Sequence, residues 1–146
     1  MSGPLIQDRE TSRRFFFDVW KKHQAAIPLQ ELEEIVLGVI LDHPEYHALL
    51  DHEKEVLPQE FAPEQGTSNP FLHMGMHIAI REQLGCNRPE GITLAFQHLR
   101  SKFASAHDLE HRVMECLGEA LWLAQRHNKL PDEISYLECV KKISQK

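Results

Sequence analysis

The chain is predicted to fold as an all-α, single-domain, up-down helical bundle of about five to six helices. Apolar residues recur at steps of three and four through most of its length, which is the period of an amphipathic helix. No segment alternates apolar and polar residues as a half-buried strand does. With 146 residues and 42% hydrophobic content, one core fits. We therefore expect one helical domain over residues 1–146, with residues 1–10 loosely ordered.

The first half of the chain contains two predicted helices and one long loop. Thr11 or Ser12 can cap the first helix, and Pro28 ends it. The second helix is interrupted at Pro44, where proline suits a new first turn, so a kink or a short break is expected there. Residues 57–69 are rich in turn-forming residues and form either a lid or a plain connector. The first predicted helix spans residues 11–26. The two pieces of the interrupted second helix span residues 29–41 and 44–56.

The second half begins with the most sharply defined helix start in the chain. Asn69 can act as the cap and Pro70 occupies the first helical position, and this helix is expected to stop at Gly85. Ser105 caps a later helix, with Asp108 in the position of a capping box. The predicted helical spans are 70–84, 89–104, 106–127 and 132–143.

Charge and composition argue against several kinds of partner. The net charge is −6 and the basic residues are scattered, so nucleic acid is not an expected partner. The longest apolar run, Ile35–Leu41, is too short to cross a bilayer, and no secretory signal is visible. Cys86, Cys116 and Cys139 match no framework spacing, which favours reduced thiols and a cytoplasmic protein. A protein partner and a homo-oligomer both stay open.

Seven potential metal ligands fall at helical spacings. Members of each group are four residues apart, or eight from His107 to Glu115, and so share one helical face. The pair that starts at His73 lies on the same stripe as core aliphatic residues, and so does the pair that starts at His107. Both pairs are therefore expected to point inward. The seven candidates are His43, His47, His73, His77, His107, His111 and Glu115.

The topology of a bundle is expected to bring these groups to one end. Both inward pairs lie in the first two turns of their helices, and one intervening helix returns the chain between them. His43 and His47 arrive at the same end if their helix runs antiparallel to the helix that starts at Asn69. We predict a site for one or two transition-metal ions, built by three segments. Its primary ligands are His73, His77, His107 and His111, and its secondary ligands are Glu115, His43, His47 and Glu45.

The donor set indicates the kind of metal. Histidines near a helix amino terminus feel the positive end of the helix dipole, which favours the neutral imidazole that binds metal. Imidazole with a carboxylate suits iron, zinc, nickel, cobalt or copper better than calcium or magnesium, which prefer oxygen ligands. The role stays open between metal or oxygen sensing, hydrolysis by a metal-bound water, and storage, so the sequence does not decide whether the protein is an enzyme.

Two other hypotheses compete with this one. In the first, the protein binds no metal and is an interaction protein, in which the histidines form a buried polar network with Arg81, Glu82 and Glu115. In the second, residues 107–111 match the H-x-x-E-H motif of inverted zinc proteases, with Glu110 activating water. The motif is short and weakly specific, and Glu110 would equally serve as an exposed acid in a first helical turn.

Several stretches resemble a small bacterial family whose function is unknown. The most specific is NPFLHMGMHIAIREQ at residues 69–83, and the likeness extends over about residues 13–143. Further matching stretches are His43–Glu45, His107–Glu119 and Tyr136–Glu138. The resemblance implies a cytoplasmic bacterial protein and implies no activity. The layout of the histidines is similar in kind to hemerythrin-like bundles and to metal-dependent thiol-transferase bundles, which are analogies of architecture only.

Overall fold

The computed structural model describes residues 5–61 and 69–143, and within these ranges the chain is all-α, as predicted. The described residues form eight α-helices and one 3-10 turn, so the expected number of five to six is wrong. No helix of this part of the chain is long and apolar enough to span a bilayer. The elements are α1 (Leu5–Gln24), α2 (Glu31–Leu41), η1 (Pro44–Tyr46), α3 (His47–Leu50), α4 (Glu53–Val56), α5 (Pro70–Cys86), α6 (Ile92–Arg100), α7 (Ala106–Arg126) and α8 (Glu133–Lys141).

The surplus of helices arises where one interrupted helix was expected. After α2 the chain forms η1, and the segment that follows is divided into the short helices α3 and α4. Asp51 and His52 separate these two helices. Asp51 accepts a hydrogen bond of 2.9 Å from the indole nitrogen of Trp20 on α1, so a contact with a distant residue holds the break.

The chain divides into two compact units, Met1–Gly75 and Met76–Lys146. Helix α5 contributes residues to both, because the boundary falls between Gly75 and Met76. His73 therefore belongs to the first unit and His77 to the second.

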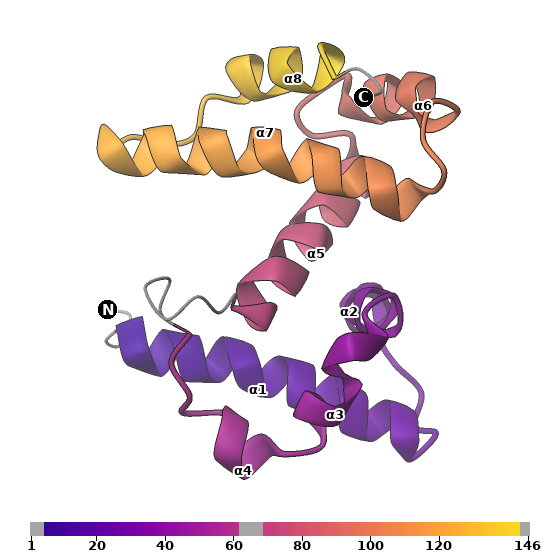
Figure 1. The fold of residues 1–146 in the computed structure, drawn as a ribbon, viewed down its shortest axis with the longest axis vertical. Coiled ribbons are helices and arrows are strands. Elements are labelled where there is room, and N and C mark those ends of the chain that lie inside the picture. The colour runs from indigo at the N-terminus through magenta and orange to yellow at the C-terminus, as the bar shows by residue number, and fades with distance from the viewer. Residues whose placement is uncertain (1–4, 62–68, 144–146) are drawn as a thin grey trace. The chain divides into compact units, whose positions relative to one another are not determined.

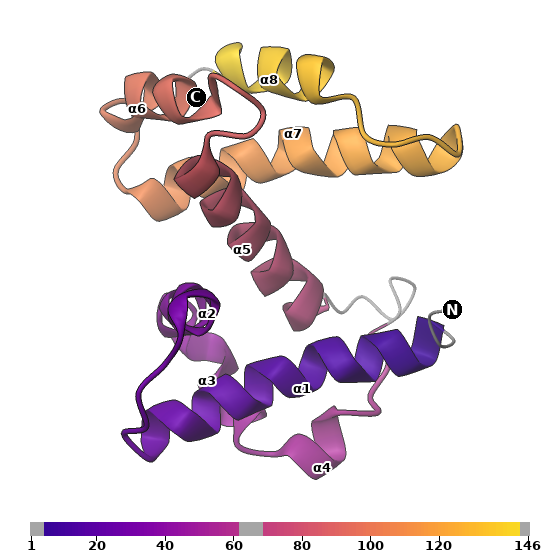
Figure 2. The same ribbon diagram turned by 180° about the vertical axis from the view of Figure 1, so that it is seen from behind.

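The first unit packs α1 against α2 and α3, and Figures 1 and 2 show α1 as its longest helix. Side chains of α1 and α2 contribute much of its core, and among them Phe17, Val19, Val39 and Ile40 are fully buried. The expectation of a loosely ordered start stays a prediction, and helix α1 runs through residues 5–10 from its start at Leu5. That stretch contains neither glycine nor proline, and nothing in it stops the helix. Residues 1–4 lie outside the described range.

A buried arginine fixes the segment that follows α4. The Arg13 side chain is 1% exposed, and its Nη1 donates to the carbonyl oxygens of Leu57 at 2.9 Å and Gln59 at 2.6 Å. Its guanidinium lies over the rings of Phe61 and Phe71, at 5.4 and 5.0 Å from their centroids. The first part of the predicted loop is thereby fixed to α1, and residues 62–68 of that loop lie outside the described range.

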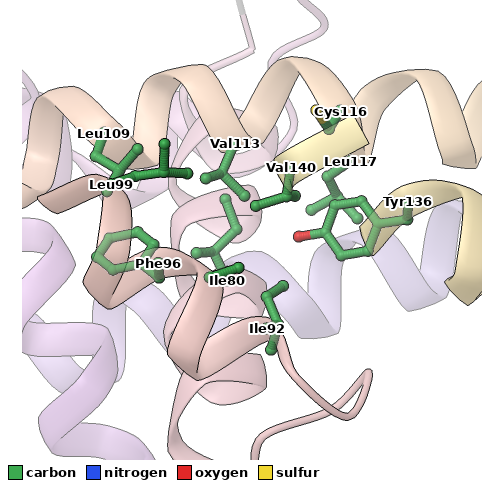
Figure 3. Close-up of a cluster of buried hydrophobic side chains, with 11 residues drawn as sticks. Ile80, Ile92, Phe96, Leu99, Leu109, Val113, Cys116, Leu117, Tyr136 and Val140 are labelled. Carbon is green, nitrogen blue, oxygen red and sulfur yellow. The ribbon is translucent and has the colours of Figure 1, made fainter. Parts of the chain in front are cut away.

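The second unit packs α6 and α8 against α7, and α8 lies along α7 in both views (Figures 1 and 2). Its apolar core draws on α5, α6, α7 and α8 (Figure 3). The hydroxyl group of Tyr136 donates a hydrogen bond of 2.6 Å to Oε1 of Gln83, which satisfies the polar end of a buried ring. The labelled core residues are Ile80, Ile92, Phe96, Leu99, Leu109, Val113, Cys116, Leu117, Tyr136 and Val140.

The helix starts predicted at Asn69 and Ser105 are confirmed by hydrogen bonds, whereas α1 and α6 begin at Leu5 and Ile92 and not at residues 11 and 89. Oδ1 of Asn69 accepts from the backbone N–H groups of Phe71 at 2.9 Å and Leu72 at 3.2 Å. The Ser105 hydroxyl accepts from the backbone N–H of Asp108 at 3.0 Å. Both side chains satisfy amide groups that have no partner inside the helix.

The expected stop of α5 at Gly85 is displaced by two residues. Asn87 adopts the left-handed conformation with φ of 55°, and the backbone N–H of Arg88 donates to the carbonyl of Gln83 at 3.0 Å. This is the hydrogen bond of a helix end that closes on a left-handed residue, a position that asparagine tolerates. The Asn87 side chain also accepts from the N–H groups of Gly91 and Thr93, which explains the choice of asparagine.

Two of the three cysteines form a disulfide, so the expectation of reduced thiols is wrong for this pair. Cys116 on α7 and Cys139 on α8 have their Cα atoms 5.8 Å apart. They are separated by 23 residues, a spacing that matches no short motif, and only the packing of α8 along α7 brings them together. Cys86 is a free, exposed cysteine.

The core of the second unit yields a first prediction. Leu109 is fully buried on α7, and Leu109→Ala should lower the free energy of unfolding by about 2–5 kcal/mol, because it removes buried methyl groups and leaves a cavity. Leu130 is 90% exposed, and Leu130→Ala should change the same quantity by less than about 0.5 kcal/mol. Urea unfolding of both variants measures this, and equal losses would contradict the assigned core.

The cap of α8 yields a prediction on pH. Hydrogen bonds from the backbone and hydroxyl of Ser135 hold the pKa of Asp132 below its ordinary 3.8. The stabilisation is therefore complete above about pH 3.8 and is lost as the pH falls through the lower, folded-state pKa. Asp132→Asn keeps a capping side chain that does not titrate. Between pH 6 and pH 3, the thermal midpoint of the wild type should fall more than that of this variant, and parallel falls would refute the assignment.

Candidate metal centre

Helices α5 and α7 bring three imidazoles of the second unit together. One ring nitrogen from each of His77, His107 and His111 lies within 4.8 Å of the other two. His77 is fully buried, and the other two histidines are half-buried. The ring centroids are 4.5–4.8 Å apart in all three pairs, so the rings form a closed triangle.

The local sequence explains how α7 supplies two of the three rings. His107 and His111 are four residues apart and lie in the first two turns of α7, which starts after the Ser105 cap. The core face of this helix is set by Leu109 and Val113, both fully buried. The two histidines therefore project from a helix that is fixed by its packing.

A buried carboxylate orients the third ring. Nδ1 of His77 and Oε1 of Glu110 are 2.7 Å apart, and an ionised carboxylate only accepts, so His77 donates. The proton of the neutral ring is then on Nδ1, and the lone pair is on Nε2. Nε2 of His77 lies 3.2 Å from Nε2 of His111. A histidine held by a carboxylate on its other nitrogen is the usual arrangement of a metal-binding histidine.

Glu110 is kept ionised by the same contacts. Burial alone raises the pKa of its carboxyl, but hydrogen bonds from His77 and Arg81 outweigh this and hold the pKa below its ordinary 4.5. Nε of Arg81 donates to Oε2 of Glu110 at 3.1 Å and to Oε1 at 3.3 Å. Glu110 is 4% exposed, so the description of it as an exposed first-turn acid is wrong.

The same contacts bear on the inverted zinc-protease hypothesis. Its water-activating base would be Glu110, but both oxygens of this carboxylate are engaged by His77 and Arg81. The geometry favours an orienting carboxylate over a base.

The distance between the two Nε2 atoms is compatible with two chemical states. Without an ion, one ring donates its N–H to the lone pair of the other. With an ion, both lone pairs point at the metal. Two nitrogens at the usual zinc distance and a tetrahedral angle are about 3.3 Å apart, close to the 3.2 Å between His77 and His111.

Within the first unit, two of the predicted ligands contact each other. The ring centroids of His43 and His73 are 4.9 Å apart, and Tyr46 shares a hydrogen bond of 2.9 Å with Nδ1 of His73. Burial, followed by the charge of Glu45, raises the pKa of Tyr46, so its hydroxyl stays protonated and donates. Nδ1–H of His43 donates to the carbonyl of Val39 at 2.7 Å. Glu45 itself is exposed.

His47 and Glu115 have other contacts. Nε2–H of His47 donates to the carbonyl of Ile40 at 2.8 Å, and its ring lies 4.6 Å from that of Trp20. The Glu115 side chain is 74% exposed and 3.8 Å from Nε of Arg112. Eight residues along a helix turn the side chain about 80° away from His107, which explains why Glu115 lies apart from the three imidazoles.

Two residues that contact the candidate histidines, Glu110 and Tyr46, were not assigned these contacts from the sequence. Glu110 was considered only as a base or a surface acid, although Arg81, one turn after His77, offered a charged partner for a buried carboxylate. Tyr46 carries no sequence signal, because its contact with His73 depends on how η1 and α5 pack.

Comparison with known proteins supports the resemblance seen in the sequence and adds no activity. No curated protein and no solved structure matches the chain. A family model described as Domain of unknown function (DUF1841) matches residues 8–142, and the chain therefore belongs to this family.

Proposed function

We propose that the protein binds a transition-metal ion through His77, His107 and His111. The observation that carries this proposal is the orientation of His77. Its Nδ1 donates a hydrogen bond to the ionised carboxylate of Glu110, while its Nε2 faces His111. Three nitrogen donors within 4.8 Å of one another fit a single ion. Three imidazoles suit zinc, iron, nickel or cobalt better than calcium or magnesium.

Three protein nitrogens leave at least one coordination position for another ligand. A tetrahedral ion with three histidines keeps a fourth position for water or a small molecule, as sites that sense or hydrolyse do. Metal binding by His43, His47 and His73 stays a prediction, as does a second ion.

Arg81 and Glu110 have a supporting role in this proposal. The carboxylate holds the tautomer and the angle of His77, and Arg81 offsets the cost of burying the charge. Neither residue needs to touch the ion.

The same contacts support a second candidate, an interaction protein without metal. Arg81, Glu110, His77 and His111 form a continuous chain of hydrogen bonds that also satisfies these groups in the absence of an ion. The two candidates differ in metal content and in the response of stability to metal.

Metal content gives the most direct prediction. Untagged wild-type protein should carry about one transition-metal ion per chain by mass spectrometry of the metals, and His77→Ala should lose at least nine-tenths of it. His98 is an exposed histidine of the same unit, and His98→Ala should retain the wild-type content. A metal-free wild type whose melting temperature ignores added zinc, iron, nickel and cobalt would favour the second candidate.

The orienting carboxylate gives a separate prediction. Glu110→Gln keeps the shape of the side chain but removes the charge, so metal affinity should fall about 10- to 100-fold. Competition with a chromogenic chelator measures this. The matched control is Glu119→Gln on the exposed part of α7, which should bind as the wild type does. Wild-type affinity in Glu110→Gln would show that this carboxylate does not support the site.

A further inference from the structure

We propose that the Cys116–Cys139 disulfide is a thiol-exchange site, served by a pocket that takes a small thiol of the amino-acid type. The inference is independent of the proposed metal site, because it rests on different residues of the second unit. Both half-cystines line a pocket of about 380 Å³ between α7 and α8. This volume is in the range of sites for small molecules.

The walls of the pocket suit a short, flexible ligand with charged ends. Apolar lining comes from Ala120, Leu123 and Leu130, while Glu119 and Lys129 provide one charge of each sign. The carboxylate of Asp132 also lines the pocket, but it accepts hydrogen bonds from Ile134 and Ser135 at the start of α8. A zwitterionic thiol can therefore pair its carboxylate with Lys129 and its ammonium group with Glu119.

The two cysteine residues differ in exposure. Cys116 is 5% exposed and belongs to the apolar core, whereas Cys139 is half-buried. An incoming thiolate therefore reaches Sγ of Cys139 more easily, and Cys116 is the leaving group.

The exchange balances in two steps. The thiolate of the small thiol attacks Sγ of Cys139, a mixed disulfide forms, the protein S–S bond breaks, and Cys116 takes a proton from water. A second thiol attacks the sulfur of the small thiol in the mixed disulfide and releases Cys139. Two small thiols are oxidised to one small disulfide, and the protein disulfide is reduced to two thiols. The disulfide of the small thiol oxidises the two protein thiols again by the reverse reaction.

Reduction has a defined structural consequence. The disulfide is the covalent link between α7 and α8, and α8 places Tyr136 and Val140 in the core of the unit. Without the link, α8 is held by noncovalent contacts alone and opens more often. Backbone amide exchange in residues 136–140 should therefore become at least tenfold faster in the reduced protein.

The test uses the full chain with Cys86→Ser, which removes the free exposed thiol. The protein is equilibrated in mixtures of reduced and oxidised glutathione without denaturant, its thiols are then alkylated, and its mass is measured. We expect a reversible change between no alkyl group and two, with faster amide exchange in α8 in the reduced state. A Cys116–Cys139 disulfide that reacts with glutathione only in denaturant would overturn the proposal.

Two variants test the role of the pocket. Ala124→Phe fills the pocket and should slow the exchange with glutathione at least tenfold, while Leu94→Phe on an exposed face of α6 should leave the rate unchanged. Lys129→Glu keeps the pocket open at an exposed position. It should slow exchange with glutathione at least threefold and leave exchange with uncharged mercaptoethanol unchanged. Wild-type rates with glutathione in both Ala124→Phe and Lys129→Glu would exclude the pocket as the binding site.

Discussion

The candidate metal centre depends on one buried carboxylate. Glu110 is almost completely buried and ionised, and this is tolerated because Arg81 and His77 both donate to it. Removal of either donor would leave the buried charge less well compensated, so the three side chains act as one unit. Their hydrogen bonds connect α7 to the second half of α5 and fix the position of the His77 ring. The geometry of the imidazoles follows from this contact.

The position of the site beside an apolar core keeps this geometry rigid. One face of α7 carries Leu109, Val113 and Leu117 into the core shown in Figure 3, and two of the three imidazoles project from the same helix. Ligands on a packed helix lose little conformational entropy when they bind an ion, because their backbone is already fixed. The disulfide between α7 and α8 adds a covalent link to the same core.

Periodicity and local chemistry could be read from the sequence, and contacts between distant residues could not. Steps of three and four predicted an all-helical chain, and the caps at Asn69 and Ser105 are local signals that the hydrogen bonds confirm. Helical spacing also selected His77, His107 and His111, because a single helix fixes which residues share a face. Three features were missed, since each requires knowledge of which helices are neighbours. They are the hydrogen bond between His77 and Glu110, the disulfide, and the division of the segment after Pro44.

If the three imidazoles converge on one ion, X-ray absorption spectroscopy of the zinc-loaded protein will detect them around the metal. We expect a coordination shell with imidazole scattering from about three rings, with nitrogen at about 2.0–2.1 Å from zinc. One ring should be lost from this shell in His77→Ala. A shell without imidazole scattering, or a wild-type spectrum in that variant, would show that these rings do not bind the ion.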